Sequence, residues 1–241
     1  MNQLSIAEVV LAEAAVLLGA WVQGSVGFGS ALLAAPLLAL LDPLFVPGPV
    51  IMLNLSLTMG MALREWSEVD LRAIGWVVVG RVPGTALGLW ALLALSPAGL
   101  GLLFALLVMV AVLLLALGHA PPRNRYTLGL AGLASGVMGV VTSIGGPPVA
   151  LMFHDVSGPA LRGTLSGFFF LSTLLSLLGL GMSGLLHWAH LQAYLLLVPG
   201  MLSGLWLSKF SRGYLDRGRT RMAVLLISGL SAVAVLLKYM Q

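Results

Sequence analysis

The sequence predicts an all-α polytopic membrane protein with two inverted-topology repeats, each a broken or re-entrant helical pair followed by three transmembrane helices. Its composition, 59% hydrophobic and 8% charged, lies far from the roughly 45–50% apolar and about 25% charged residues of soluble domains. Apolar stretches long enough to cross a bilayer follow one another along the 241 residues. A third observation, the return of one Pro- and Gly-containing motif, predicts the duplication.

Nine apolar stretches are expected, separated by short polar loops and without a soluble domain or long linker. They occupy residues 4–22, 26–41, 44–63, 72–95, 98–118, 127–153 with a break, 163–186, 190–208 and 222–239. The first stretch lacks a basic n-region and a small-residue cleavage site, so we expect no removable signal peptide. The absence of cysteine excludes disulfides and thiolate metal ligands.

Positive charges are confined to alternate loops and predict the orientation of the chain. They are Arg64, Arg72, Arg123, Arg125, Arg162 and the group Lys209, Arg212, Arg217, Arg219 and Arg221. Turns near 42–45, 96–97 and 187–190 contain no Lys or Arg, so the basic loops should face the cytoplasm. Residues 4–41 must then enter and leave from outside, and residues 127–154 from the cytoplasm, with both termini outside.

The motif VPGTALGLW at residues 82–90 returns as VPGMLSGLW at 198–206, with identity at six of nine positions. Gly24, Gly27 and Pro36 also align with Gly136, Gly139 and Pro148, at a slightly shorter offset that a small insertion explains. Three spans follow each pair, so the second half is inverted. We expect a first transmembrane repeat at residues 1–118 and a second at 119–241, within one integral membrane domain. Chance matching is the alternative, since Gly and Pro are common in membrane helices.

Two segments should interrupt their helices: QGSVGFGSALLAAP at residues 23–36 and SGVMGVVTSIGGPP at 135–148. Lipid cannot satisfy the backbone groups that a break leaves unpaired, so these must face protein or a water-filled cavity. Helix N-termini at such breaks attract anions. Interrupted helices in inverted repeats indicate a secondary transporter with a site near the midplane; close packing through small residues is the alternative.

Arg81 is the strongest candidate for binding a substrate. It lies in VVVGRVPG, near the middle of an apolar stretch, where arginine costs about 2.5–3.5 kcal/mol on insertion scales. It should therefore face the bundle interior, where its planar guanidinium matches an oxyanion. Its counterpart in the second repeat is Leu197, and a charge present once indicates a task performed once. The alternative is a structural role, with Arg81 paired to a buried carboxylate or to carbonyls freed by Pro83.

Uncharged groups near the breaks are expected to complete the site. The candidates are Asn54, Gln23, Ser25, Ser30, Gly27, Gly29, Thr142, Ser143, Gly145 and Gly146. For Asn54 an interhelical hydrogen bond is an equal alternative. For the serines and the threonine, simple packing is the favoured interpretation. We expect no metal site and no cofactor, because His119, His187 and His190 lack metal-ligand spacing.

Four titratable residues are candidates for proton coupling: Glu13, Asp42, His154 and Asp155. Intramembrane or break-adjacent ionisable groups are common in proton pathways. One hypothesis is that Glu13 pairs with Arg81 until an anion displaces it. For the other three the alternative is an interfacial loop or a helix cap.

The segments GSVGFGSALLAAPLLALL and SGVMGVVTSIGGPPVAL, in a small chain with two similar halves, resemble the sulfite exporter TauE/SafE family, also described as probable membrane transporter proteins. The likeness covers nearly the whole chain. It implies a multi-pass protein of the bacterial inner membrane that exports or exchanges small sulfur-containing anions such as sulfite, sulfoacetate or other organosulfonates. Expected partners are that anion, a proton or counter-ion and the lipid bilayer, with no nucleic acid and no predicted oligomeric state.

Three other interpretations remain at this stage. The chain is not expected to be an enzyme. An intramembrane serine hydrolase is the enzymatic alternative, and Ser25 with His154 is the pairing that it would use. A non-transporting membrane scaffold or assembly factor is a second alternative. An anion channel shares the transporter's sequence features.

Overall fold

The computed structural model describes residues 5–64, 67, 69–118, 120–156, 158–211 and 217–240, and this part contains helices and no β-strand. The elements are α1 (Ile6–Val26), α2 (Ser30–Leu41), the short 3-10 helix η1 (Pro43–Phe45), α3 (Gly48–Arg64), α4 (Leu71–Ala94), α5 (Pro97–Leu117), α6 (Arg125–Thr142), α7 (Gly146–Met152), α8 (Gly158–Met182), α9 (Trp188–Ser211) and α10 (Arg217–Met240). Within these residues six helices are long and apolar enough to cross a membrane: α1, η1 with α3, α4, α5, α8 and α9. The predicted class, a polytopic helical membrane protein, is confirmed.

Helix ends follow local capping chemistry. Ser5 and Glu8 form a capping box at the start of α1, while Asp70 and Ser96 accept hydrogen bonds from backbone N–H groups that would otherwise be unpaired. Helix α8 begins earlier than expected, at Gly158 and not near residue 163, so Arg162 lies in the first turns of the helix.

The first break is shorter than the sequence predicts. Helix α1 continues to Val26, and only residues 27–29 are non-helical. Gly27 and Gly29 have φ angles of 104° and 110°, which glycine adopts without a Cβ clash. The chain then reverses, and α2 folds back along α1 so closely that a Cβ on Gly19 would lie 2.7 Å from the carbonyl oxygen of Ser30.

The second break has the same construction with different residues. Helix α6 ends at Thr142, Ser143 takes a left-handed φ of 64°, and α7 begins at Gly146. Pro147 and Pro148 lie in the first turn of α7, where a missing N–H breaks no helical hydrogen bond. The hydroxyl of Ser135 donates to the carbonyl of Gly145 at 2.5 Å and ties α6 to the turn.

The two breaks correspond at a different spacing from the one read off the sequence. Gly27 and Ser143, the left-handed C-caps of α1 and α6, are 116 positions apart (143 minus 27), and Val82 and Val198 of the repeated motif are separated by the same 116 (198 minus 82). The expected pairing of Gly24 with Gly136 has a shorter offset and would not align these C-caps, whereas an offset of 116 aligns both the C-caps and the repeated motif.

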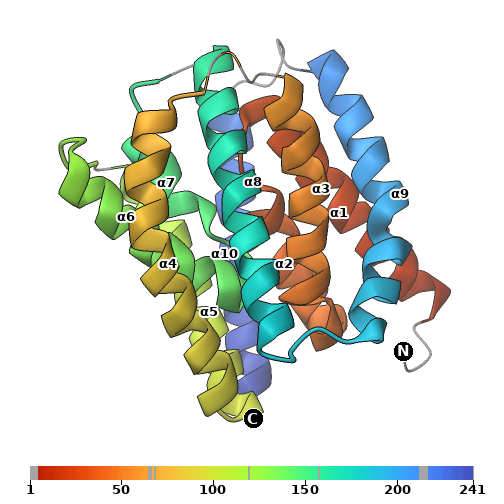
Figure 1. Ribbon diagram of the computed structural model, residues 1–241. Coiled ribbons are helices and arrows are strands. Elements are labelled where there is room, and N and C mark those ends of the chain that lie inside the picture. Colours follow the sequence, from red (N-terminus) through yellow and green to blue (C-terminus); the bar gives the residue numbers. More distant parts are fainter. Residues whose placement is uncertain are drawn as a thin grey trace.

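The repeated VPGxxxGLW motif packs each half against the broken helix of the other half. Helix α4 lies along α6, and α9 lies along α1, with α3 and α8 between the two pairs (Figure 1). A Cβ on Gly84 would overlap the backbone of Leu133 in α6, and one on Gly200 would overlap the backbone of Glu13 in α1. The glycines of the motif thus allow close backbone approach, as small residues do in membrane helix interfaces.

We expect Gly84→Ala to destabilise the protein by about 1–3 kcal/mol, because overpacking at a close backbone contact forces the helices apart. Gly75→Ala on the same helix is the matched control, since nothing lies within 4 Å of its Cβ position, and it should be neutral or slightly stabilising. Thermal unfolding in detergent compares the two variants. Equal stability of both would show that the Gly84 contact is not tight.

Candidate anion-binding site

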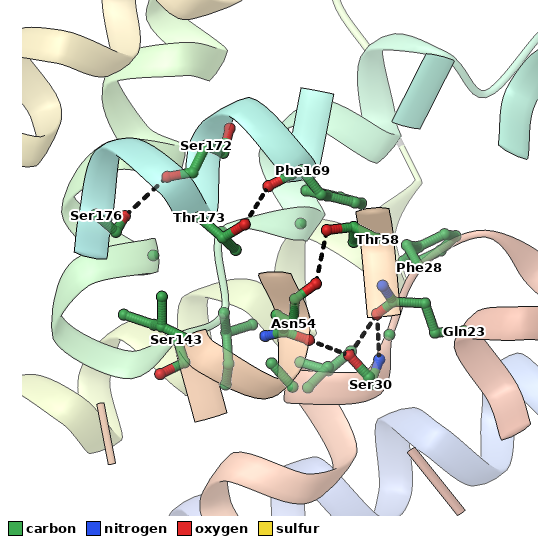
Figure 2. A pocket seen from close by; sticks show the side chains of 18 of the residues that line it. Gln23, Phe28, Ser30, Asn54, Thr58, Ser143, Phe169, Ser172, Thr173 and Ser176 are labelled. Atoms are coloured by element: carbon green, nitrogen blue, oxygen red, sulfur yellow. Dashed lines mark hydrogen bonds between the residues drawn. The ribbon is translucent and has the colours of Figure 1, made fainter. Parts of the chain in front are cut away.

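A cavity of about 530 Å³, counting its open mouth, lies where the two breaks meet. Both breaks contribute to its wall, together with α3, α4 and α8 (Figure 2). The polar and aromatic lining residues are Gln23, Phe28, Ser30, Asn54, Thr58, Arg81, Ser143, Phe169, Ser172, Thr173 and Ser176, and the glycines are Gly29, Gly139, Gly145 and Gly146. The interruptions thus do face a cavity.

Arg81 is buried, with 2% of its surface exposed, and its guanidinium is held by neutral groups. Its Nη1 donates to the carbonyl and the hydroxyl of Ser135 at 2.8 and 2.7 Å. Its Nη2 donates to the hydroxyl of Ser176 at 3.0 Å and the carbonyl of Ser172 at 3.3 Å. Nε has no hydrogen-bond partner. The side chain therefore links α4 to α6 and α8 and retains one free donor.

Two glycines make room for this guanidinium. A Cβ on Gly139 would lie 2.6 Å from Nη2, and one on Gly145 would lie 2.9 Å from Nη1 of Arg81. Glycine at these two positions is thus required by the neighbouring cation and not by the backbone turn, since Gly145 has an ordinary φ of −86°. The sequence singled out Gly145 as an anion ligand but did not indicate that it contacts Arg81.

No carboxylate contacts Arg81 among the described residues; the ion pair between Arg123 and Asp155 lies elsewhere, at the surface. Glu13 packs against Gly200 on α9, so the hypothesised Glu13–Arg81 pair is absent from this structure. The carbonyl freed by Pro83 is not the partner either, because Ser135 and Ser172 accept the bonds. A buried charge without a counter-charge is costly, and a bound anion would supply that counter-charge.

A second polar cluster joins the first break to α3. The Ser30 hydroxyl lies 2.6 Å from Asn54 Oδ1 and also hydrogen bonds to Gln23 Oε1, which accepts the Ser30 backbone N–H at 3.1 Å. These bonds occupy the amide oxygens of Gln23 and Asn54. No hydrogen bond from either amide nitrogen is found within the described chain, so both nitrogens remain as donors beside the cavity.

Most of the residues expected at the site line the cavity, and three do not. The lining includes Arg81, Asn54, Gln23, Ser30, Gly29, Ser143, Gly145 and Gly146. Ser25, Gly27 and Thr142 lie outside it. Ser25 donates to the carbonyl of Trp21, Thr142 to that of Met138, and the Gly27 turn packs against Arg162. Since α1 continues through residue 26, the helix turns Ser25 away from the cavity.

The sequence did not indicate the contribution of α8. The backbone carbonyl of Ser172 and the hydroxyl of Ser176 hold the guanidinium, while Thr173 and Phe169 line the wall. Spacing of four residues places Ser172 and Ser176 on one helical face, and Asn54 and Thr58 on α3 have the same spacing. Polar residues at i and i+4 within an apolar span were the signal available for finding them.

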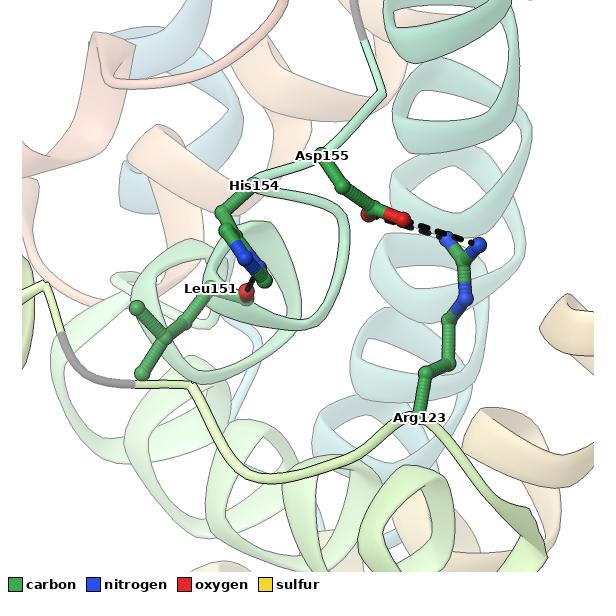
Figure 3. Close-up of polar contacts among 4 residues, drawn as sticks. All are labelled: Arg123, Leu151, His154 and Asp155. Carbon is green, nitrogen blue, oxygen red and sulfur yellow. Dashed lines mark hydrogen bonds and ion pairs between the residues drawn. The ribbon is translucent and has the colours of Figure 1, made fainter.

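None of the four proposed coupling residues is among those that line the cavity. Asp42 caps η1 by accepting from the N–H of Leu44 at 2.8 Å. Figure 3 shows His154 Nδ1 against the carbonyl of Leu151 at 3.2 Å, and Asp155 paired with Arg123 at 3.3 Å. Both are exposed, which fits the interfacial alternative.

The pairing needed for a serine hydrolase does not form in this structure. Ser25 bonds to Trp21 and lies beside Ser211, whereas His154 contacts Leu151, and no hydrogen bond joins Ser25 to His154. A nucleophile requires a base within hydrogen-bond reach.

These features define a class: a multi-pass helical membrane protein with a buried cation in a cavity between two interrupted helical pairs. A model of the family described as "Sulfite exporter TauE/SafE" matches residues 12–235. The chain therefore belongs to the sulfite exporter TauE/SafE family, as the sequence motifs indicated, and membership places it among membrane exporters of sulfite and related anions. No curated protein and no solved structure matched the chain.

Ser30→Ala is expected to destabilise the protein by about 1–3 kcal/mol, because it leaves the buried Oδ1 of Asn54 without its donor, while Gln23 Oε1 keeps the backbone N–H of residue 30. Ser56→Ala, on α3, serves as the control, since its hydroxyl bonds only at a half-buried position, to Tyr194 and Met52. Thermal unfolding of both variants measures the difference. A smaller loss in Ser30→Ala than in Ser56→Ala would contradict the arrangement of this cluster.

Proposed function

We propose that the protein is a secondary transporter that exports small sulfur-containing oxyanions, such as sulfite, sulfoacetate or another organosulfonate, across a bacterial inner membrane by alternating access. One observation carries the proposal: the buried guanidinium of Arg81 lines a cavity and contacts only neutral groups. Family membership supports the class of cargo.

The donors around the cavity are suited to the oxygens of such an anion. Arg81 contributes its positive charge at the cavity wall. The amide nitrogens of Gln23 and Asn54 add neutral donors from the opposite break and from α3. Hydrogen bonds to an ionised acceptor are shorter and stronger than hydrogen bonds between neutral groups. The guanidinium and the two amide nitrogens would therefore favour an oxyanion bound in the cavity.

Alternating access requires two units that move relative to each other around a fixed site. The proposed repeats, residues 1–118 and 119–241, exchange their packing: α1 of the first lies on α9 of the second, and α6 of the second lies on α4 of the first. Both breaks line the cavity. If these paired bundles rocked against each other, the cavity at Arg81 would therefore open first to one side of the membrane and then to the other.

Glu13 is the proposed coupling residue, in preference to Asp42, His154 and Asp155. It lies within α1, two turns from the helix start, and contacts α9 at Gly200. Protonation there would change the contact between one half and the other. Asp42 and Asp155 are already engaged in a cap and a surface ion pair.

Arg81→Gln should abolish anion binding, and Arg81→Lys should weaken it by about tenfold or more, because lysine keeps the charge but loses the planar fork. The measurement is the rise in apparent unfolding temperature on adding methanesulfonate or sulfite to the purified protein, since a ligand specific for the folded state stabilises it by mass action.

Arg123→Gln is the matched control for this experiment, because it removes an arginine whose guanidinium pairs at the surface with Asp155. It should retain the full anion effect. Retained stabilisation in Arg81→Gln would overturn the assignment of Arg81, and no stabilisation of wild type by any sulfur oxyanion would favour the scaffold interpretation.

Glu13→Gln tests the coupling in proteoliposomes loaded with methanesulfonate, an anion whose charge does not change with pH. An imposed proton gradient should accelerate efflux through wild type and not through Glu13→Gln, while both bind the anion equally. Glu8→Gln, on the exposed start of the same helix, should behave as wild type. A gradient response that survives in Glu13→Gln would exclude this residue as the coupling site.

A further inference from the structure

The cavity holds a single formal charge. Arg81 is the one ionisable residue among the described residues that line it, and every other polar group there is an amide, a hydroxyl or backbone. Its hydrogen-bond partners, Ser135, Ser172 and Ser176, are neutral. The fixed charge available to a ligand is therefore one positive unit.

Helix dipoles do not add appreciably to this charge. At the first break the C-terminus of α1 and the N-terminus of α2 meet within residues 27–29, and at the second the C-terminus of α6 meets the start of α7 within residues 143–145. The partial negative and positive ends of the helices thus lie side by side and offset each other. The backbone N–H of Ser30 is already bonded to Gln23.

Charge balance then selects the ionisation state of the cargo. A monoanion beside Arg81 gives a neutral pair, whereas a dianion leaves one negative charge uncompensated in a site surrounded by apolar helices. An unpaired charge in such surroundings is strongly unfavourable. Neutral donors such as the Asn54 amide stabilise either ion and do not reverse the preference.

Resting on the proposed function and narrowing its range of cargoes, we infer that the cavity selects singly charged sulfur oxyanions, hydrogen sulfite or a simple organosulfonate, over the sulfite dianion, sulfate and doubly charged sulfonates. Sulfoacetate, a dianion, is thereby removed from the cargoes proposed above. Each sulfite equivalent then leaves together with its own proton. Selection by charge also discriminates sulfite from sulfate without any difference in shape, because sulfite can enter as hydrogen sulfite whereas sulfate remains a dianion at neutral pH.

The test compares three anions by their effect on the unfolding temperature of the purified full chain. Methanesulfonate is a monoanion throughout, sulfate is a dianion throughout, and sulfite changes from one to the other across its second ionisation. Sulfite is compatible with the protein because the chain contains no cysteine. Titrations are made on both sides of that ionisation, with methanesulfonate correcting for effects of pH on the protein itself.

We expect methanesulfonate to bind at least about tenfold more tightly than sulfate. The apparent dissociation constant of sulfite should rise about tenfold per pH unit above its second ionisation, as the bound species becomes scarce. Equal or tighter binding of sulfate, or sulfite binding that strengthens with pH, would overturn the inference and leave the anion-transport proposal intact. If none of the three anions binds, the proposed function fails as well.

A charge placed in the cavity provides an independent check. Thr173 lines the wall on α8, and Thr173→Lys adds a second positive unit, with Thr173→Met as an uncharged control of similar length. The ratio of sulfate to methanesulfonate affinity should rise about tenfold or more in Thr173→Lys alone. An unchanged ratio in the folded variant would contradict charge selection, and the wild-type anion series decides the question if Thr173→Lys does not fold.

Discussion

The burial of one guanidinium within an apolar helical bundle is the constraint on which the site depends. Arg81 cannot reach water or lipid headgroups from the middle of α4, so neighbouring helices must supply its hydrogen bonds. Ser135 on α6 and Ser176 on α8 do so, and glycine at position 139 leaves the space. One side chain thereby fixes the relative positions of three helices and defines the polar end of the cavity.

The two breaks solve a related problem for the backbone. Where α1 and α6 stop inside the bundle, carbonyls and N–H groups lose their helical partners and must be satisfied by protein or cavity. Gln23 accepts the N–H of Ser30 at the first break, and Ser135 donates to the carbonyl of Gly145 at the second. The Ser135 hydroxyl also accepts from Arg81. At the second break one residue therefore bonds both to a backbone carbonyl of the turn and to the cation, which is not the case at the first break.

The asymmetry between the halves has a chemical meaning. Leu197 is fully buried at the position in α9 that corresponds to Arg81 in α4. An amide and hydroxyl cluster therefore lies beside the first break, whereas the guanidinium of Arg81 lies beside the second. Under the proposed function, a ligand between the two breaks would meet hydrogen-bond donors from both halves but a charge from only one, so an anion would bind in one orientation. Arg81 combines this role with holding α6 and α8 together.

Composition and motif spacing were enough to predict the membrane class, the approximate positions of the apolar helices, the existence of two breaks and the inward direction of Arg81. Each follows from local chemistry: apolar length, Gly and Pro content, and the cost of an unpaired charge in lipid. The packing of the helices was needed to show that the Ser172 carbonyl and the Ser176 hydroxyl reach Arg81 while Ser25 and Thr142 do not. Helical periodicity shows which residues share a face, but the neighbour that this face meets depends on how distant helices pack.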